Sequence, residues 1–173
     1  MADADRPLID LELVRRPHDR RAYDLGDVGS LRVTGFWSRR ATATAGPRTW
    51  ELARTSLWTT ASAAADEAGA ETGAFVPRTL RRGGTLTWQG RSYELRPESS
   101  FRDRYALVED GLERAVFEGK GWGRRPVAVS LDPTWRPEPG LLLFAAFVVR
   151  ALADDASGAA GGSTAAVTAA TSG

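Results

Sequence analysis

The sequence predicts a mainly β fold, an antiparallel barrel that closes around one central hydrophobic helix at about residues 139–153. Three observations support this prediction. Apolar and polar residues alternate in short segments as far as residue 131, which is typical of antiparallel strands with one face in the core and one in water. Glycine-containing turn sequences separate those segments, and one long apolar run follows them.

The alternating segments are short and regularly spaced. We count roughly eleven before residue 132, at the spacing expected of a barrel or a sandwich. Asp110-Gly111, a strong hairpin signal, and Gln89-Gly90 lie between segments. The alanine-rich stretch 59–69 has helical propensity, but we interpret it as strand and turn because strands flank it. The clearest segments are Ile9–Leu13, Leu31–Trp37, Trp50–Leu52, Leu86–Trp88, Tyr93–Leu95, Tyr105–Leu107 and Val127–Leu131.

The expected helix begins near Pro139, a residue that suits the first position of a helix. Residues 141–149 are apolar without interruption, and Arg150 is the first charged residue after them. A helix that is apolar on every side must be enclosed on every side. The run is also much shorter than the about 20 apolar residues of a membrane span. Because cans of about eleven strands can hold a helix, the strand count and the apolar helix support each other.

Composition limits the possible functions. The chain has no cysteine, which excludes a disulfide framework, a thiol nucleophile and a thiolate metal site. The net charge is only +1, so no global field attracts nucleic acid. The first residues are acidic and no apolar segment follows, so we expect a cytoplasmic protein. We expect one domain over residues 1–155 and a disordered tail, rich in Ala, Gly, Ser and Thr, over residues 156–173.

Several motifs occur in an order that resembles a known family. They are Trp88-Gln-Gly-Arg-Ser-Tyr-Glu-Leu95, Ser100-Phe101, Tyr105-Ala-Leu107, Asp110-Gly111, Val127–Leu131 and the apolar helix Pro139–Leu152. Together they resemble the Tubby C-terminal-like superfamily, which includes LURP-one-related proteins, phospholipid scramblases and bacterial relatives of unknown function. The resemblance runs over residues 8–153 and is sharpest from residue 85 onward.

This resemblance implies a closed barrel of roughly twelve antiparallel strands around a central C-terminal helix. It also implies activities on lipids, since Tubby-type domains bind phosphoinositide head groups and scramblases move lipids between leaflets. The chain departs from the scramblase pattern, because it has no cysteine cluster and no proline-rich N-terminus. No position here matches a phosphoinositide-binding residue of the family.

The most suggestive functional stretch is the glycine-rich segment 119–125. Its three glycines would leave backbone N–H groups free to hold a phosphate. Lys120, Arg124 and Arg125 would supply positive charge, and Trp122 would lie at a membrane interface. These four residues are our candidates for anion or lipid binding. The alternative is a glycine-rich hairpin with solvated arginines and a packed tryptophan, since isolated glycine motifs often have no function.

Other residues carry weaker functional signals. Four arginine pairs would form an anion-binding patch if they shared one end of the barrel: Arg15-Arg16, Arg20-Arg21, Arg39-Arg40 and Arg81-Arg82. His18 is the only histidine; in a basic loop we expect it to be solvated, and alone it cannot build a zinc site. A glycosidase-type pair would need two carboxylates that face each other across a cleft, whereas Glu109, Asp110, Glu113 and Glu118 fit outward strand and turn positions.

The leading functional hypothesis is a non-enzymatic, cytoplasmic binding module without a cofactor. Its partner would be either an anionic lipid head group, with peripheral membrane association, or another protein. An enzyme or small-ligand binder with a site at the barrel mouth is the first alternative, and it predicts a deep pocket with convergent polar groups. A structural subunit of an assembly is the second, and it predicts a large exposed apolar patch. Fold alone does not decide among them.

Overall fold

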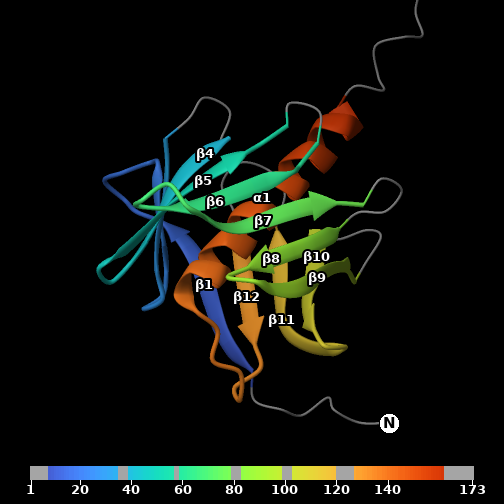
Figure 1. The fold of residues 1–173 in the computed structure, drawn as a ribbon. Coiled ribbons are helices and arrows are strands. Elements are labelled where there is room, and N and C mark those ends of the chain that lie inside the picture. Colours follow the sequence, from blue (N-terminus) through green and yellow to red (C-terminus); the bar gives the residue numbers. More distant parts are fainter. Residues whose placement is uncertain are drawn as a thin grey trace, which may run out of the picture.

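The computed structural model describes residues 8–34, 39–56, 59–78, 83–98, 103–119 and 127–161. Within these residues, twelve strands form a closed antiparallel barrel around one helix (Figure 1). This confirms the predicted fold class. The strands are β1 (Ile9–Arg15), β2 (Ala22–Leu25), β3 (Gly29–Val33), β4 (Arg40–Ala45), β5 (Arg48–Arg54), β6 (Ser62–Asp66), β7 (Glu71–Pro77), β8 (Gly84–Trp88), β9 (Arg91–Pro97), β10 (Asp103–Glu109), β11 (Leu112–Gly119) and β12 (Val127–Leu131).

Each strand pairs with its neighbours in the sequence, and β1 pairs with β12 to close the barrel. The closing pair is in antiparallel register, with Ile9 opposite Leu131 and Leu11 opposite Val129. A closed barrel leaves no strand edge unpaired. The alanine-rich stretch is indeed strand and turn, because β6 occupies Ser62–Asp66 and pairs with β5 and β7.

The predicted hairpins form as their residue types require. Both central residues of the β10–β11 turn have positive φ, +52° at Asp110 and +78° at Gly111. The β8–β9 turn is similar, with +48° at Gln89 and +78° at Gly90. Two consecutive residues with positive φ match the twist of the flanking strands, which explains why a glycine occupies the second position.

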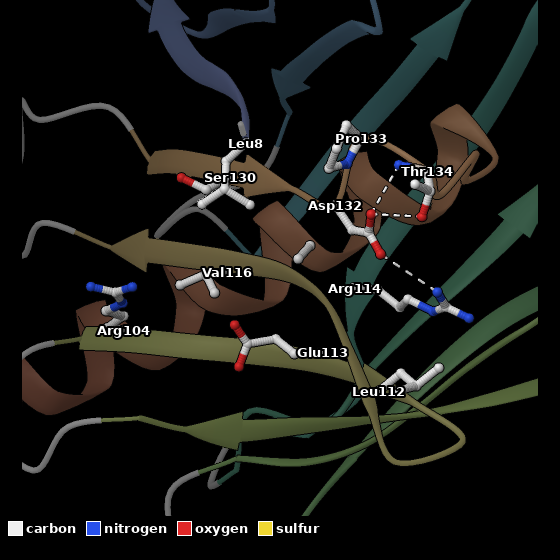
Figure 2. A pocket seen from close by; sticks show the side chains of 11 residues that line it. Leu8, Arg104, Leu112, Glu113, Arg114, Val116, Ser130, Asp132, Pro133 and Thr134 are labelled. Atoms are coloured by element: carbon white, nitrogen blue, oxygen red, sulfur yellow. Dashed lines mark hydrogen bonds and ion pairs between the residues drawn. The ribbon is translucent and has the colours of Figure 1, made fainter. Parts of the chain in front are cut away.

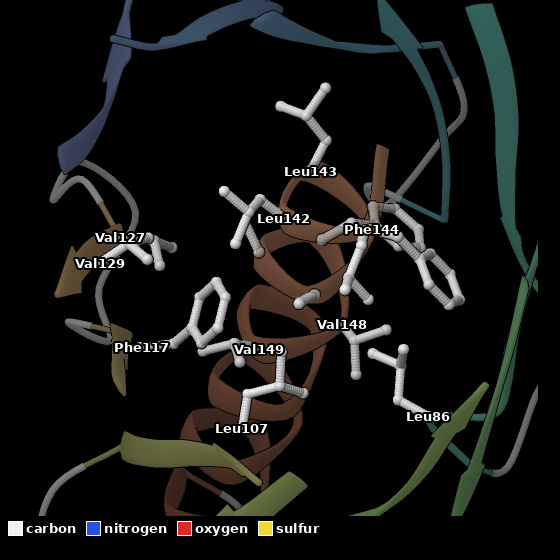
Figure 3. Packing of buried hydrophobic residues seen from close by; sticks show 14 of the residues in the cluster. Leu86, Leu107, Phe117, Val127, Val129, Leu142, Leu143, Phe144, Val148 and Val149 are labelled. Atoms are coloured by element: carbon white, nitrogen blue, oxygen red, sulfur yellow. The ribbon is translucent and has the colours of Figure 1, made fainter. Parts of the chain in front are cut away.

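The helix α1 (Pro139–Gly161) runs through the barrel and supplies its core (Figure 1). All nine residues from Leu141 to Val149 are at most 4% exposed, because the barrel surrounds the helix on every side. Figure 3 shows Leu142, Phe144 and Val149 pointing outward from the helix axis toward inward-facing residues of the strands, such as Leu86 and Leu107.

The helix ends later than the sequence predicts. It reaches Gly161 rather than residue 153, so the first six residues of the predicted tail are helical. Three of these six residues are alanine, the best helix former. Residues 162–173, the rest of the predicted tail, lie outside the described residues.

Polar contacts hold the helix at both ends of the barrel. At its start, the Glu138 carboxylate accepts hydrogen bonds from the guanidinium of Arg48 and the indole of Trp88. At its exit, Arg150 donates to the Tyr23 hydroxyl at 3.0 Å and lies over the ring, 4.4 Å from its centroid. The register of α1 in the barrel is therefore fixed by packing along its length and by polar contacts at its ends.

Candidate functional site

Among the described residues, side chains fill most of the barrel interior. The side chains of α1 and of the inner strand faces form one continuous buried cluster. The hollow next to the helix exit, lined by Tyr23, Phe147 and Arg150 among others, measures only about 10 Å³. That is the space of about one water molecule. Any binding by these residues therefore takes place on the outside of the barrel or at its two ends.

The two ends of the barrel differ in how the chain connects the strands. Because an antiparallel barrel alternates strand direction, every second connection lies at the same end. One end, which we call the turn end, holds the connections 26–28, 46–47, 67–70, 89–90, 110–111 and 132–138. These contain five acidic residues and one arginine, a net charge of −4: Asp27, Glu67, Asp110, Asp132, Glu138 and Arg136.

The opposite end, which we call the basic end, holds the connections 16–21, 34–39, 55–61, 78–83, 98–102 and 120–126, together with the exit of α1. In the sequence, these connections contain eleven basic and two acidic residues, and the exit of α1 adds Arg150, Asp154 and Asp155. Three of the four predicted arginine pairs lie here among the described residues, at positions 15–16, 20–21 and 39–40. The topology thus brings together residues that are up to 25 positions apart in the chain.

Backbone hydrogen bonds fix the position of the arginines along the rim. The Val33 amide donates to the Arg21 carbonyl at 2.8 Å, and the Thr34 amide donates to the Arg40 carbonyl at 3.0 Å. Arg21 and Arg40 therefore flank the end of β3 on its two sides. The Arg54 amide donates to the Arg39 carbonyl at 2.9 Å, which continues the row to β5. The rim from β1 to β5 is a continuous arc that carries the three pairs.

Some arginines near this arc are neutralised by carboxylates. Arg16 pairs with Asp24 at 2.6 Å, and Arg32 pairs with Asp19 at 3.1 Å. The hydrogen bond from Arg16 lowers the pKa of Asp24 below its ordinary value. Arg54 pairs with Asp155 of the helix at 2.8 Å. These contacts attach the connections and the helix to the barrel.

Four arginines of the arc have no such partner. Within the part of the chain that the structure describes, no carboxylate forms an ion pair with Arg15, Arg20, Arg21 or Arg40, and all four residues are exposed. Four uncompensated guanidinium groups on a single rim produce a positive potential that the overall net charge of +1 conceals.

A groove of about 430 Å³ lies on the outer face of β10, β11 and β12 (Figure 2). Leu8, Leu112 and Val116 form its apolar part. Its charged groups are engaged with one another: Arg114 approaches Asp132 at 3.6 Å, and Asp132 accepts hydrogen bonds from Thr134.

The charged groups on this face lie close enough to shift the pKa of Glu113. Burial and the neighbouring Glu98 carboxylate raise the pKa of Glu113, while Arg96 and Arg104 oppose that shift. Arg104 in turn pairs with Glu98 at 2.7 Å. The mutual pairing leaves this face without free charge to attract a ligand, so we do not assign it as the site.

The structure describes some of the remaining predicted residues but not others. Lys120, Trp122, Arg124 and Arg125 lie outside the described residues, as do Arg81 and Arg82. The flanking strands β11 and β12 end at Gly119 and begin at Val127, at the basic end. His18 is exposed in connection 16–21 at that same end. Glu109 contacts Arg91 and Arg114 rather than a second carboxylate across a cleft.

The comparisons with known proteins add no assignment. A scan of protein-family models, a search of curated proteins and a search of solved structures each found no match to this chain. The resemblance to Tubby-like proteins therefore stays a prediction. Among the described residues, no helix combines the length and apolar character needed to cross a bilayer, and no three His, Cys, Asp or Glu side chains come together as a metal site would require.

Proposed function

We propose that this protein is a non-enzymatic binding module whose basic end binds the surface of an anionic membrane. The observation that carries the proposal is the separation of charge between the two ends. Connections at the turn end have a net charge of −4, whereas the arc from β1 to β5 at the other end presents four uncompensated arginines.

The size of this charge is adequate for reversible membrane association. A basic residue close to an anionic leaflet contributes about 1 kcal/mol. The four free arginines then contribute about 4 kcal/mol, which corresponds to a dissociation constant near 1 mM. Lys120, Arg124 and Arg125 would strengthen binding further if they lie near the same surface, because their connection begins and ends at the basic end.

The sequence of the connections at the basic end supports a membrane as the partner. Besides the basic residues, these connections contain Phe36, Trp37, Trp58, Phe101 and Trp122, all outside the described residues. At the turn end, Trp135 is the only aromatic residue in a connection. Aromatic side chains beside arginines are the composition favoured at the membrane–water interface.

The other functional hypotheses find less support. The filled barrel interior gives no support to a small-ligand site at the barrel mouth. The exposed large apolar residues of the described part are Leu8, Ile9, Val14, Val76 and Leu112. Leu8 and Leu112 share the groove, but Ile9, Val14 and Val76 lie elsewhere on β1 and β7, which does not favour a structural subunit with one large apolar patch.

The test is co-sedimentation with neutral and anionic vesicles at low and physiological salt. We expect salt-sensitive binding to the anionic vesicles alone. The double variant Arg20→Ser/Arg40→Ser should bind more weakly, as should Lys120→Ser/Arg124→Ser/Arg125→Ser. The matched control Arg91→Ser/Arg136→Ser removes Arg136 from a turn-end connection and Arg91 from the start of β9, next to connection 89–90. It should bind like the wild type.

Two results would contradict the proposal. One is the absence of binding to every anionic vesicle, which would favour a protein partner. The other is an equal loss of binding in the control variant, which would mean that net charge matters and that the basic end does not.

A further inference from the structure

The basic end has the chemistry of a diffuse charged surface rather than that of a pocket. We propose that it recognises the charge density of an anionic bilayer and does not distinguish one lipid head group from another. This inference rests on the proposed membrane binding and specifies its partner. Three features of the described residues support it.

The first feature is that the free arginines are not held in place. Selective head-group recognition requires side chains fixed by packing and by hydrogen bonds from neighbouring groups. Within the described residues, the guanidinium groups of Arg15, Arg20, Arg21 and Arg40 take part in no hydrogen bond or ion pair with another side chain. These side chains can therefore adopt several rotamers.

The second feature is the opposite behaviour of the arginines that are fixed. Arg16 donates three hydrogen bonds to the Asp24 carboxylate, at 2.6–3.0 Å. Arg54 donates to Asp155 and to the Thr59 carbonyl. Both guanidinium groups are pre-organised, but each is already occupied by a carboxylate of the same chain. Among the described residues, Arg16, Arg32 and Arg54 are thus neutralised by carboxylates of the chain, whereas Arg15, Arg20, Arg21 and Arg40 keep their charge uncompensated.

The third feature is that backbone amides along the rim already donate hydrogen bonds within the chain. A phosphate cradle presents several free N–H groups to the anion. Here the amides of Arg16, Ala22, Val33 and Thr34 all donate to carbonyl oxygens of the chain. The Arg21 amide donates to the Asp19 side chain at 3.0 Å. These amides cannot coordinate a phosphate without breaking the contacts that close the connections.

The spacing of the arc agrees with this interpretation. Arg21 and Arg40 border the end of β3 from the two adjacent strands, so their backbones are separated by two strand spacings, roughly 9–10 Å. Neither the groove nor the hollow at the helix exit includes a free arginine of the arc. Charges spread along the rim outside these two cavities can interact with many lipids at once.

The experiment compares vesicles of matched formal surface charge that contain phosphatidylserine, phosphatidylglycerol or a phosphoinositide in phosphatidylcholine. We expect partition coefficients that agree within about three-fold, because only charge density is sensed. Arg20→Ser/Arg40→Ser should lower each of them about 25-fold, about five-fold for each charge. Arg20→Lys/Arg40→Lys should restore wild-type binding, since a diffuse surface does not require the planar guanidinium.

The inference would be overturned by a preference of about ten-fold or more for one head group at matched charge. Failure of the lysine variant would overturn it too, as would displacement of the protein from vesicles by a soluble inositol phosphate. Each of these outcomes still leaves membrane binding itself intact. A lack of binding to all three vesicles would instead refute the proposed function on which the inference depends.

Discussion

Replacing Phe144 by alanine tests whether the helix is the core of the barrel. The side chain is fully buried, and its ring lies 5.8 Å from the Trp88 ring, centroid to centroid. A Phe→Ala change in a core costs about 3–5 kcal/mol, and more when the surroundings cannot collapse. The hydrogen-bonded ring of strands around α1 limits such collapse, so we expect the upper half of this range. A typical domain has a net stability of about 5–15 kcal/mol.

The assay is urea unfolding followed by circular dichroism. With a denaturant slope of about 2 kcal/mol per molar urea, the midpoint should fall by about 2 M while the slope stays constant. The control is Val76→Ala, because Val76 is 64% exposed on the outside of β7; its effect should remain within about 0.5 kcal/mol. If Phe144→Ala behaved like this control, the helix would not fill the barrel, and the interior would offer space for a ligand.

Two further predictions concern the entry of the helix and the outer face. In Gly140→Ala, the added Cβ would lie 2.4 Å from a Trp88 ring carbon and 2.9 Å from a Trp50 ring carbon. Thermal unfolding should show that this overpacking lowers the free energy of unfolding by about 1–3 kcal/mol. Unchanged or higher stability would show that the tryptophans can move. The effect of Glu113→Gln on stability depends on pH. Because the folded-state pKa of Glu113 is raised, the ionised side chain destabilises the folded state above that pKa. This destabilisation disappears as the pH falls through the raised pKa. The variant should therefore match or exceed the wild type in urea midpoint at neutral pH and lose this advantage in acid, whereas a clearly less stable variant at neutral pH would mean that Arg96 and Arg104 outweigh Glu98.

Much of the fold could be predicted because its two signals are strong in a single sequence. Alternation places Leu13, Leu86 and Leu95 in the core, where all three are at most 1% exposed. Alternation fails in β10, where Ala106 and Val108 point outward yet are at most 5% exposed. A register shift follows Leu107, and the paired charges of β9 and β11 lie on the same face. The burial of these outward-facing residues depends on side chains of neighbouring strands, and the periodicity of one segment gives no information about those neighbours.

The candidate site was harder to predict, although the sequence contained a usable signal. The sequence identifies each arginine pair, but the common location of the pairs depends on the number and direction of the strands. Once a closed antiparallel barrel is assumed, alternate connections must share an end. Summing charge over alternate connections would then have predicted the basic end. Which arginines are neutralised could not be predicted, because the pairing of Arg54 with Asp155 joins residues 101 positions apart.

The position of α1 in the chain has a consequence for biosynthesis. All twelve strands precede the helix, so the segment that fills the barrel is the last described element to leave the ribosome. At about 5–20 residues per second, the 23 residues of α1 require about 1–5 seconds of synthesis after the strands are complete. During that interval the inner faces of the strands lack their partner. Nascent chains of this protein should therefore depend on chaperones until α1 has left the ribosome.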